Sequence, residues 1–587
     1  MVRRRIWNRG DLRLLVVGLV FVLAWAGIGY RLFNLQGSRA VALATVGFDQ
    51  RIKEQPIPAV RGTVYDRDGV ELAMTIDGWN VVVDPMMLDD PAAAALVLAP
   101  YADVGLPELT TALIEAQSKG RRYEEVAMRV DTAHRDAIKA AVQAYNEAND
   151  PDIVGVFYRE QPLRVYPAGD IAAQVIGLTA YDDGTGIEGL ERTFNSELEG
   201  EPGKLIVEHD PAGRVIPQGQ VLLEPAVPGS DIVTTIDREI QFTVEQGLRK
   251  AIQKTNAIGG SIVVMDPETG AILAMASWPS LDLNDRSQVS PEVLRNRAVA
   301  DVYEPGSTLK TVTIAAAIEE GVVTKDTPID TPKSVTIGDF EYEDIGHNPA
   351  WMSVADVVKR SSNVGTIEIQ RRLGNDVHYD YLTAFGLGSP SGLDVAGERH
   401  GQLNPATRWN ETSGSSIAIG YAVGTTPLQM AAVYSAIAND GMCIEPYLVS
   451  EVIHPDGTRI AAKPRTRRVI SAETAEVMRL MLGRVVASDD GTGRRAQMSD
   501  FTAGGKTGST FKFDVDLQRY TDDTVASFIG MAPLYDPKIV VVVVLDTPTG
   551  TLDDGADLAN GGASAAPVFA EVAQIVLHQL GVAPDKL

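Results

Sequence analysis

Ser307 and Lys310 are the first residues in this chain whose types and spacing could do chemistry. They lie in the stretch Glu304–Lys310, where a Pro-Gly pair ends the preceding segment and an apolar, helix-compatible run follows over 311–318. Residues three apart in a helix share a face, and a buried lysine that has lost its proton could take the proton of the serine. The alternative is a helix-capping serine beside an unrelated lysine, because Ser-x-x-Lys matches also arise by chance.

A second stretch offers a hydroxyl and a carboxamide two residues apart. Ser361 and Asn363 follow a run over 354–359 that is predicted to be helical. Taken alone, this segment is better interpreted as a helix-end loop rich in capping residues.

A third stretch surrounds one Lys-Thr pair, Lys506 and Thr507, with small residues over 503–509. Small residues are typical of a strand edge where a ligand backbone comes close. A flexible glycine loop is the alternative. A phosphate-binding loop is excluded, because its first glycine would have to stand where the chain has Asp500.

The elements that must position these residues form a mixed domain. Residues 232–236 predict a strand, and Asp237 caps a helix that runs to about residue 255. The runs 260–265 and 271–277 predict an antiparallel hairpin, 525–530 and 539–545 predict two further strands, and 566–580 predicts a final helix. Because strands lie at both ends of this region with helices between them, we expect an α+β domain around an antiparallel sheet built from distant segments.

The N-terminus predicts export. Five arginines precede an uncharged apolar run over 14–30, whose apolar character continues to about residue 33. This length suits a membrane-spanning helix, and the arginines predict a cytoplasmic N-terminus. A cleaved signal peptide is the alternative, because Ala24-Trp25-Ala26 resembles a cleavage site. Both interpretations place the chain after residue 40 outside the cytoplasm.

Composition limits the classes of function. The 587 residues carry 52 Lys and Arg against 78 Asp and Glu, a net charge of -26, which disfavours binding to nucleic acid. The single cysteine, Cys443, excludes an intrachain disulfide and makes a cysteine-based metal site implausible. Residues 41–225 contain alanine-rich helical segments, such as 91–97 and 132–148, and no cluster of side chains that suggests chemistry.

Together, the three stretches resemble the ordered active-site motifs of penicillin-binding proteins and serine β-lactamases. They are Ser307-Thr308-Leu309-Lys310, Ser361-Ser362-Asn363 and Lys506-Thr507-Gly508. The stretches 61–69, 186–191, 265–270 and 420–441 also look like class B penicillin-binding proteins, so the resemblance covers nearly the whole chain from the anchor onwards. The Ser-x-Asn and Lys-Thr-Gly motifs look most like those of the division-specific (septal) members, the FtsI or penicillin-binding protein 3 type.

This resemblance implies three parts. Residues 1–40 are expected to form a cytoplasmic tail and a transmembrane anchor, with the span at about 14–33. Residues 41–227 are expected to form a non-catalytic pedestal of the dimerisation type. Residues 228–587 are expected to form the transpeptidase domain, in which helices flank the antiparallel sheet.

The resemblance also implies a mechanism, in which Ser307 attacks the penultimate D-alanine of a stem peptide and forms an acyl-enzyme. Lys310 acts as the base, Ser361 relays a proton to the leaving amine, and Lys506 sets the local electrostatics. The motifs leave open which lysine is the base at each step. An amine from a neighbouring stem peptide then resolves the acyl-enzyme and forms the cross-link, and neither a metal nor a cofactor is implied.

The same resemblance places the substrate-binding residues. Asn363 is expected to bind the amide of the donor peptide, and Thr507 with Lys506 is expected to hold its terminal carboxylate. Gly508 is also expected to be a substrate-binding residue. The backbone N–H groups of Ser307 and Ser509 are expected to form the oxyanion hole. The family usually has threonine where this chain has Ser509, so a side-chain role at that position is less secure.

The partners implied are peptidoglycan stem peptides, β-lactams, a SEDS-family glycosyltransferase of the FtsW type and other division proteins. The expected location is the bacterial inner membrane at the division site. The elongation-type class B transpeptidase is the main alternative. A D,D-carboxypeptidase or β-lactamase, a penicillin sensor without turnover and a structural protein with a dead site are further alternatives; the two hydrolases would need a water-activating base that the sequence does not reveal.

Overall fold

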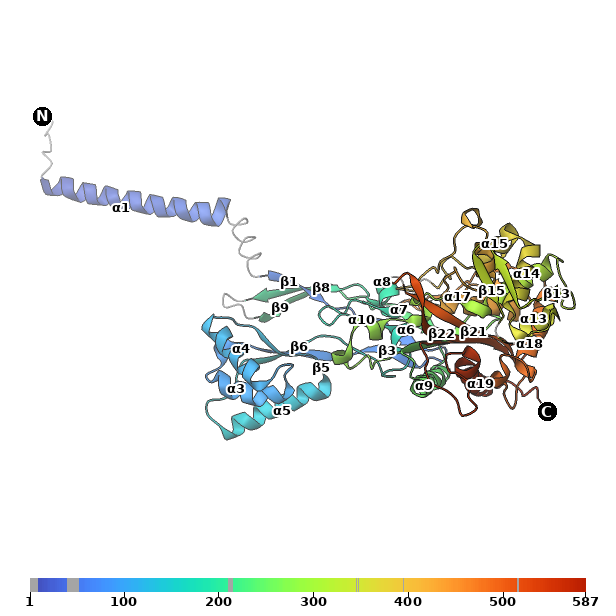
Figure 1. The fold of residues 1–587 in the computed structure, drawn as a ribbon. Coiled ribbons are helices and arrows are strands. Elements are labelled where there is room, and N and C mark those ends of the chain that lie inside the picture. The colour runs from blue at the N-terminus through green and yellow to red at the C-terminus, as the bar shows by residue number, and fades with distance from the viewer. Residues whose placement is uncertain are drawn as a thin grey trace, which may run out of the picture. The chain divides into compact units, whose positions relative to one another are not determined.

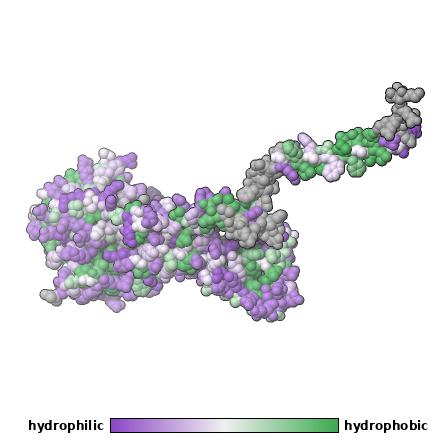
Figure 2. Space-filling model, turned by 180° about the vertical axis from the view of Figure 1, so that it is seen from behind, coloured by the Kyte–Doolittle hydropathy of each residue, from purple (hydrophilic) through white to green (hydrophobic). Residues whose placement is uncertain are grey.

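The computed structural model describes residues 9–39, 52–209, 215–344, 346, 348–393, 395–514 and 517–586. Its first element is the helix α1 (Arg9–Phe33), which continues as a π-helical turn over Asn34–Ser38. The side chains of α1 are exposed, and hydrophobic residues cover most of the helix in Figure 2. Within the described ranges, Arg9–Gly37 is the one helical segment long and apolar enough to cross a membrane. This helix is consistent with the expected membrane anchor.

The chain forms two compact units. The smaller comprises the residues up to Ala59 with Glu201–Val227, and the larger comprises Val60–Gly200 with Pro228–Leu587. The strands of the smaller unit pair antiparallel in the order β1-β8-β9: β1 (Ile52–Ile57), β8 (Gly203–His209) and β9 (Val215–Glu224). All other elements below belong to the larger unit.

One part of the larger unit is a small sheet covered by three helices. The strands pair antiparallel in the order β5-β4-β6: β4 (Gly78–Val83), β5 (Glu124–Asp131) and β6 (Val156–Glu160). The helices are α3 (Pro91–Leu98), α4 (Leu106–Ser118) and α5 (Thr132–Ala148). Thus the alanine-rich runs do form helices. Their apolar faces bury Leu98, Leu113 and Ile138 against Val81 and Val83 of the sheet.

A six-stranded sheet joins the N-terminal and C-terminal halves of the larger unit. Its order is β19-β18-β10-β2-β3-β7, with β2 parallel to β10 and all other pairs antiparallel. The strands are β2 (Val64–Tyr65), β3 (Glu71–Ile76), β7 (Leu163–Val165), β10 (Asp231–Thr234), β18 (Val449–Ile453) and β19 (Arg459–Ala461). Segments on both sides of the expected boundary at 227/228 therefore share one sheet.

A five-stranded sheet carries the third motif. All of its strands pair antiparallel in the order β12-β11-β23-β22-β21, as expected for this region. The strands are β11 (Gly259–Met265), β12 (Ile272–Trp278), β21 (Gly504–Asp514), β22 (Arg519–Ala532) and β23 (Ile539–Asp546). Two helices lie close to it, α9 (Arg238–Thr255), capped by Asp237, and α19 (Gly561–Gln579), which begins earlier than the expected residue 566.

Both faces of this sheet are buried, because successive side chains of a strand point to opposite faces. In β23, Val541 and Val543 lie in the core formed with α9 and α19, whereas Val540 and Val542 lie in the core on the other face. Figure 1 shows α9 and α19 below β21 and β22, and α17 (Pro427–Ala438) above them. An uninterrupted apolar strand is the sequence signature of such a central position.

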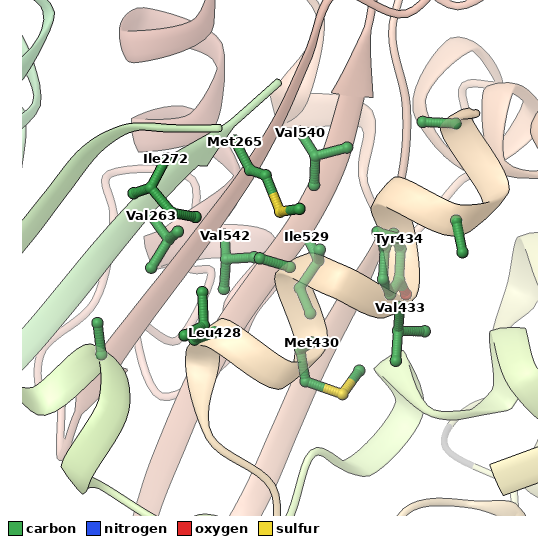
Figure 3. Close-up of a cluster of buried hydrophobic side chains, with 14 of the residues drawn as sticks. Val263, Met265, Ile272, Leu428, Met430, Val433, Tyr434, Ile529, Val540 and Val542 are labelled. Carbon is green, nitrogen blue, oxygen red and sulfur yellow. The ribbon is translucent and has the colours of Figure 1, made fainter. Parts of the chain in front are cut away.

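Helix α17 is buried along its whole length. Figure 3 shows Leu428 and Met430 beside Val542 and Ile529 of the sheet, with Tyr434 one turn further along the helix. A helix that is apolar all round suits this interior position. From it, the hydroxyl of Tyr434 reaches the segment that carries the first motif, as described below.

A helical region covers this same face of the sheet and holds the first two motifs. Its helices are α10 (Pro291–Leu294), α11 (Arg297–Ala300), α12 (Lys310–Glu319), α13 (Val354–Arg360), α14 (Asn363–Leu373), α15 (Asn375–Ala384), α16 (Ser413–Ala418) and α18 (Ala472–Ala487). Short strands connect them: β13 (Pro328–Asp330), β14 (Ser334–Ile337), β15 (Phe340–Glu343), β16 (Trp351–Ser353), β17 (Met442–Ile444) and β20 (Thr466–Arg468). Helices α12 and α14 pack against each other.

Candidate active site

Ser307 lies in a tight turn rather than inside an α-helix. Residues Gly306–Thr308 form a 3-10 turn, and α12 begins at Lys310. Gly306 has φ +55, and a Cβ there would lie 2.4 Å from the Thr510 side chain of β21. The Tyr434 hydroxyl donates to the carbonyl of Thr308 at 2.9 Å. The edge strand and the buried α17 therefore fix the turn that presents Ser307, whose side chain stays partly exposed.

Lys310 is 1 % exposed and points into the site. Its Nζ donates to the carbonyl of Ser361 at 2.6 Å, to the Oδ1 of Asn363 at 2.7 Å and to the Oγ of Ser361 at 3.3 Å. Burial lowers the pKa of Lys310 to about 7, and the charge of Asp344 acts in the opposite direction. At neutral pH a large fraction of Lys310 is therefore unprotonated and able to accept a proton.

Ser361 occupies the junction between α13 and α14. It has φ +59, the left-handed conformation that ends α13, while Ser362 caps α14 by accepting from the N–H of Gly365 at 2.9 Å. The predicted helix over 354–359 is confirmed, and the capping interpretation of this segment is correct for Ser362. The left-handed turn also directs Ser361 towards the buried lysine of the first motif.

Lys506 approaches the same hydroxyl from the sheet. It lies on β21, is fully buried, and its Nζ donates to the Oγ of Ser361 at 2.8 Å and to the carbonyl of Thr507 at 3.2 Å. Burial, followed by the charge of Lys310, lowers the pKa of Lys506 well below its usual value. The Oγ of Ser361 thus lies within hydrogen-bond distance of both lysines.

The rest of the third motif also lies on β21, the edge strand of the sheet. Among the strands that the structure describes, β21 pairs with β22 alone, so its other side offers backbone groups to an extended peptide. Thr507 donates through its Oγ1 to Thr492 at 3.2 Å. A Cβ on Gly508 would lie 2.4 Å from the Oγ of Ser527 and 3.0 Å from the carbonyl of Pro305. The glycine therefore allows the strand to lie against the turn that carries Ser307.

Ser509 has a structural contact of its own. Its Oγ accepts from the N–H of Gly561, the first residue of α19, at 3.0 Å. Its side chain therefore anchors a helix end to the edge strand. The sequence left a role of the Ser509 side chain in the active site less secure. The hydrogen bond to Gly561 gives this side chain a structural role instead.

Asp344, which directly follows β15, also belongs to the site although it lies outside the three sequence motifs. Its carboxylate accepts from the Oγ of Ser362 at 2.6 Å and from the N–H of Val364 at 3.0 Å. No local pattern marks this residue, because its partners lie about twenty positions further along the chain. Among the described residues, no group of three or more His, Cys, Asp or Glu side chains could hold a metal ion.

The comparisons with known proteins cover both halves of the chain. A family model described as "Penicillin binding protein transpeptidase domain" matches residues 260–574, and one described as "Penicillin-binding Protein dimerisation domain" matches residues 56–234. The chain is 31% identical to the stage V sporulation protein D of Bacillus subtilis, over 98% of this chain and 86% of that protein. It is 30% identical to the peptidoglycan D,D-transpeptidase FtsI of Escherichia coli, over 96% and 91%.

Among solved structures, the chain is similar to penicillin-binding protein 3 of Mycobacterium tuberculosis in complex with aztreonam. The TM-score is 0.70 with 30% identity, over 90% of this chain and 98% of that one. Three motifs that lie far apart in the sequence also converge on one hydroxyl, that of Ser361. The chain therefore belongs to the class B penicillin-binding proteins, the serine D,D-transpeptidases of peptidoglycan.

Proposed function

We propose that Ser307 is the nucleophile and that neutral Lys310 is the base in acylation. The Oγ of Ser307 attacks the carbonyl carbon of the penultimate D-alanine as its proton passes to the Nζ of Lys310. The C–N bond then breaks, and the released amine of D-alanine takes up a proton through the Oγ of Ser361. The observation that carries this proposal is a fully buried Lys310 whose Nζ lies within hydrogen-bond distance of the Oγ of Ser361, the hydroxyl that Lys506 also contacts. Burial there lowers the pKa of Lys310 to about 7.

Lys506 and the edge strand complete the acylation site. Lys506 holds the hydroxyl of Ser361 in place and supplies positive charge when protonated. The donor peptide lies along β21 beside Gly508, with its terminal carboxylate at Thr507 and Lys506. The N–H groups of Ser307 and Ser509 stabilise the oxyanion, and Asn363 binds the donor amide once it is released from Lys310.

Deacylation uses the same residues in reverse. The amine of a neighbouring stem peptide attacks the ester carbon, an amide forms, and the bond to the Oγ of Ser307 breaks. The proton lost by the amine returns to this Oγ through Lys310 or Ser361. The product is a cross-link between two strands.

The biological role that we propose is cross-linking at the division septum. The anchor α1 would keep the N-terminus in the cytoplasm and the catalytic domain outside. A glycan-polymerising membrane protein of the SEDS family and other division proteins would be the partners. The relative from B. subtilis is named for sporulation, so a role in a specialised septum or wall layer is the second candidate.

Labelling with a fluorescent penicillin tests the catalytic proposal. We expect one long-lived covalent adduct on the full-length protein, mapped to Ser307 by peptide mass spectrometry and absent in Ser307→Ala. Thr308 provides no substitute nucleophile, because its Oγ1 is buried and donates to the carbonyl of Pro305 at 2.7 Å. Rapid loss of the adduct would indicate a β-lactamase, and no adduct at all would refute the proposal.

Two further measurements separate the remaining alternatives. Purified protein incubated with peptidoglycan strands should yield cross-linked dimers, whereas a carboxypeptidase would yield only trimmed monomers. A fluorescent fusion in growing cells should concentrate at the division site. A uniform distribution along the side wall would contradict the septal role.

A further inference from the structure

The carboxylate of Asp344 is fixed by three contacts beside the second motif. Its two oxygens accept from the Oγ of Ser362 at 2.6 Å, from the N–H of Val364 at 3.0 Å and from the Nδ2 of Asn348 at 2.8 Å. The carbonyl of Glu343, the preceding residue, accepts from the Nδ2 of Asn363 at 2.9 Å. The segment after β15 therefore holds the start of α14 from one side.

Lys310 holds the same residues from the other side. Its Nζ donates to the carbonyl of Ser361 and to the Oδ1 of Asn363. These residues alternate along the chain with Ser362 and Val364, which Asp344 contacts. Among the described residues, no ion pair within 4 Å joins Asp344 to Lys310. The carboxylate thus acts on the lysine through the loop between them and through its charge.

The charge of Asp344 matters because the surroundings of Lys310 disfavour an ammonium ion. The lysine is buried, it faces the positive N-terminal end of α14, and Lys506 of β21 lies across the hydroxyl of Ser361. Against these, Asp344 is the one charge that raises the pKa of Lys310. It compensates the N-terminus of α14 at the N–H of Val364.

We propose that Asp344 is a positioning residue for acylation, which holds Ser361 and Asn363 against Lys310 and sets the pH range in which this lysine accepts the serine proton. The proposal rests on the assignment of Lys310 as the base. Asp344 does not touch the substrate or the reacting atoms. Its negative charge stabilises the ammonium that forms when neutral Lys310 accepts the proton of Ser307, and this same proton is the one that passes on towards the leaving amine.

A simpler role for Asp344 would be to cap α14 only. A cap contributes to stability, and its loss would lower the acylation rate equally at every pH. Loss of a nearby anion would instead make Lys310 easier to deprotonate and move the rising part of the pH profile. The pH profile therefore distinguishes the two roles.

The experiment measures the rate of acylation of the full-length protein in detergent by a fluorescent penicillin. The pH runs from about 5 to about 9, so that it spans the pKa of Lys310 on both sides. In Asp344→Asn, the midpoint of the rising limb should move to lower pH by about half a unit to one unit. Asp490→Asn is the matched control, because Asp490 is an aspartate that pairs with Lys359 and Arg360, next to Ser361. The control should keep the wild-type midpoint.

Asp344→Ser carries the same expectation and keeps a small acceptor for the N–H of Val364, should Asp344→Asn not fold. Thermal unfolding of each variant reports the capping contribution separately. An unchanged midpoint in a folded variant with a reduced rate would overturn the inference and leave only the cap. If wild-type protein forms no adduct, the failure lies instead with the proposed function.

Discussion

At the scale of single residues, the site is organised by two buried lysines around one hydroxyl. Two ammonium ions this close would repel each other, and both are removed from water. Burial therefore lowers the pKa of both lysines, and the charge of Lys310 lowers that of Lys506 further. The Oγ of Ser361 can donate to whichever lysine is neutral and accept from the other. A proton can therefore enter the site at Lys310 and leave it at Ser361 without water.

The pKa of Lys310 predicts the pH dependence of acylation. In the proposed mechanism the neutral form is the base, so the rate should rise about tenfold per pH unit below pH 7 and level off above it. Lys310→Arg should lack this rising limb and lose about a hundredfold or more in rate, because a guanidinium does not deprotonate. Stopped-flow acylation by a fluorescent penicillin measures both effects.

Lys325→Arg is the control for this substitution. Lys325 is half exposed and pairs with Asp326 on the surface, so the same chemical change there should leave the profile as in the wild type. A rising limb that persists in Lys310→Arg would show that another group is the base. Lys506 would then be the remaining candidate, because it also contacts the Oγ of Ser361.

At the scale of elements, the nucleophile turn depends on Gly306. The residue has a positive φ, and a Cβ there would lie 2.4 Å from the Thr510 side chain. Gly306→Ala should therefore strain the turn and separate it from β21, with a loss of about tenfold or more in acylation and about 2–3 kcal/mol in stability. Acylation kinetics and chemical denaturation measure these two losses.

Gly321→Ala is the matched control for Gly306→Ala. Gly321 lies just past α12 with φ +66, and no atom would lie within 4 Å of its added Cβ. Gly321→Ala should therefore show the effect of backbone strain alone: the free energy of unfolding should fall by about 1 kcal/mol and the acylation rate should stay at the wild-type value. Equal effects of the two substitutions would show that the contact with Thr510 does not matter.

His378, on helix α15, should make the folded protein less stable in acid. His378 is fully buried, its Nε2 contacts the Oγ1 of Thr313 on α12, and burial lowers its pKa to about 3. Below about pH 6.5 the unfolded chain binds a proton that the folded chain does not, so stability falls as the pH falls from 6.5 towards 3. Between pH 6.5 and 5 this histidine should contribute a loss of about 2 kcal/mol.

The variant His378→Gln isolates this contribution, because its side chain does not titrate. The difference in unfolding free energy between wild type and variant should shrink by the same amount as the pH falls from 6.5 to 5. Denaturant unfolding at the two pH values measures it. A difference that does not change with pH would mean that His378 is protonated in the folded protein.

The sequence predicts most of these elements but not their precise junctions. Apolar periods and capping residues mark α9, α13 and the strands of the five-stranded sheet, because these signals are local. The left-handed conformation of Ser361 and the role of Asp344 are not predictable in this way. The left-handed turn that ends α13 falls on a serine, where glycine is the usual signal. The contacts of Asp344 with Ser362 and Val364 span 18 and 20 positions along the chain, beyond the reach of a local pattern.

At the scale of the whole molecule, the same limit applies to the division into domains. Composition predicts a joint near residue 227, and the sequence changes character there. However, β2 pairs in parallel with β10, so a segment from before the joint belongs to a sheet with segments from after it. A parallel pairing has no local turn signal, which explains why the sequence does not reveal it.

A buried ion-pair cluster stabilises this connection. Glu191 is fully buried and accepts from the Nε of Arg61 at 2.6 Å and from the Nε of Arg164 at 2.7 Å. Arg164 also donates to the carbonyl of Gly62, next to β2, at 2.7 Å. The cluster therefore joins the segment just before β2 to β7 and to the short helix α7 (Gly189–Thr193), far from the three motifs in sequence.

Glu191→Gln should destabilise the protein by about 3–5 kcal/mol, because it leaves two buried guanidinium groups without their counter-ion. Glu115→Gln is the matched control: its surface pair with Lys119 is exposed, and its loss should leave the unfolding midpoint almost unchanged. Folded Glu191→Gln protein, selected at low temperature, should still be acylated at the wild-type rate, since Glu191 contacts no motif residue. Denaturant unfolding and acylation kinetics of the same samples test both expectations. A large loss of rate without a loss of stability would show that this cluster acts on the active site rather than on the fold.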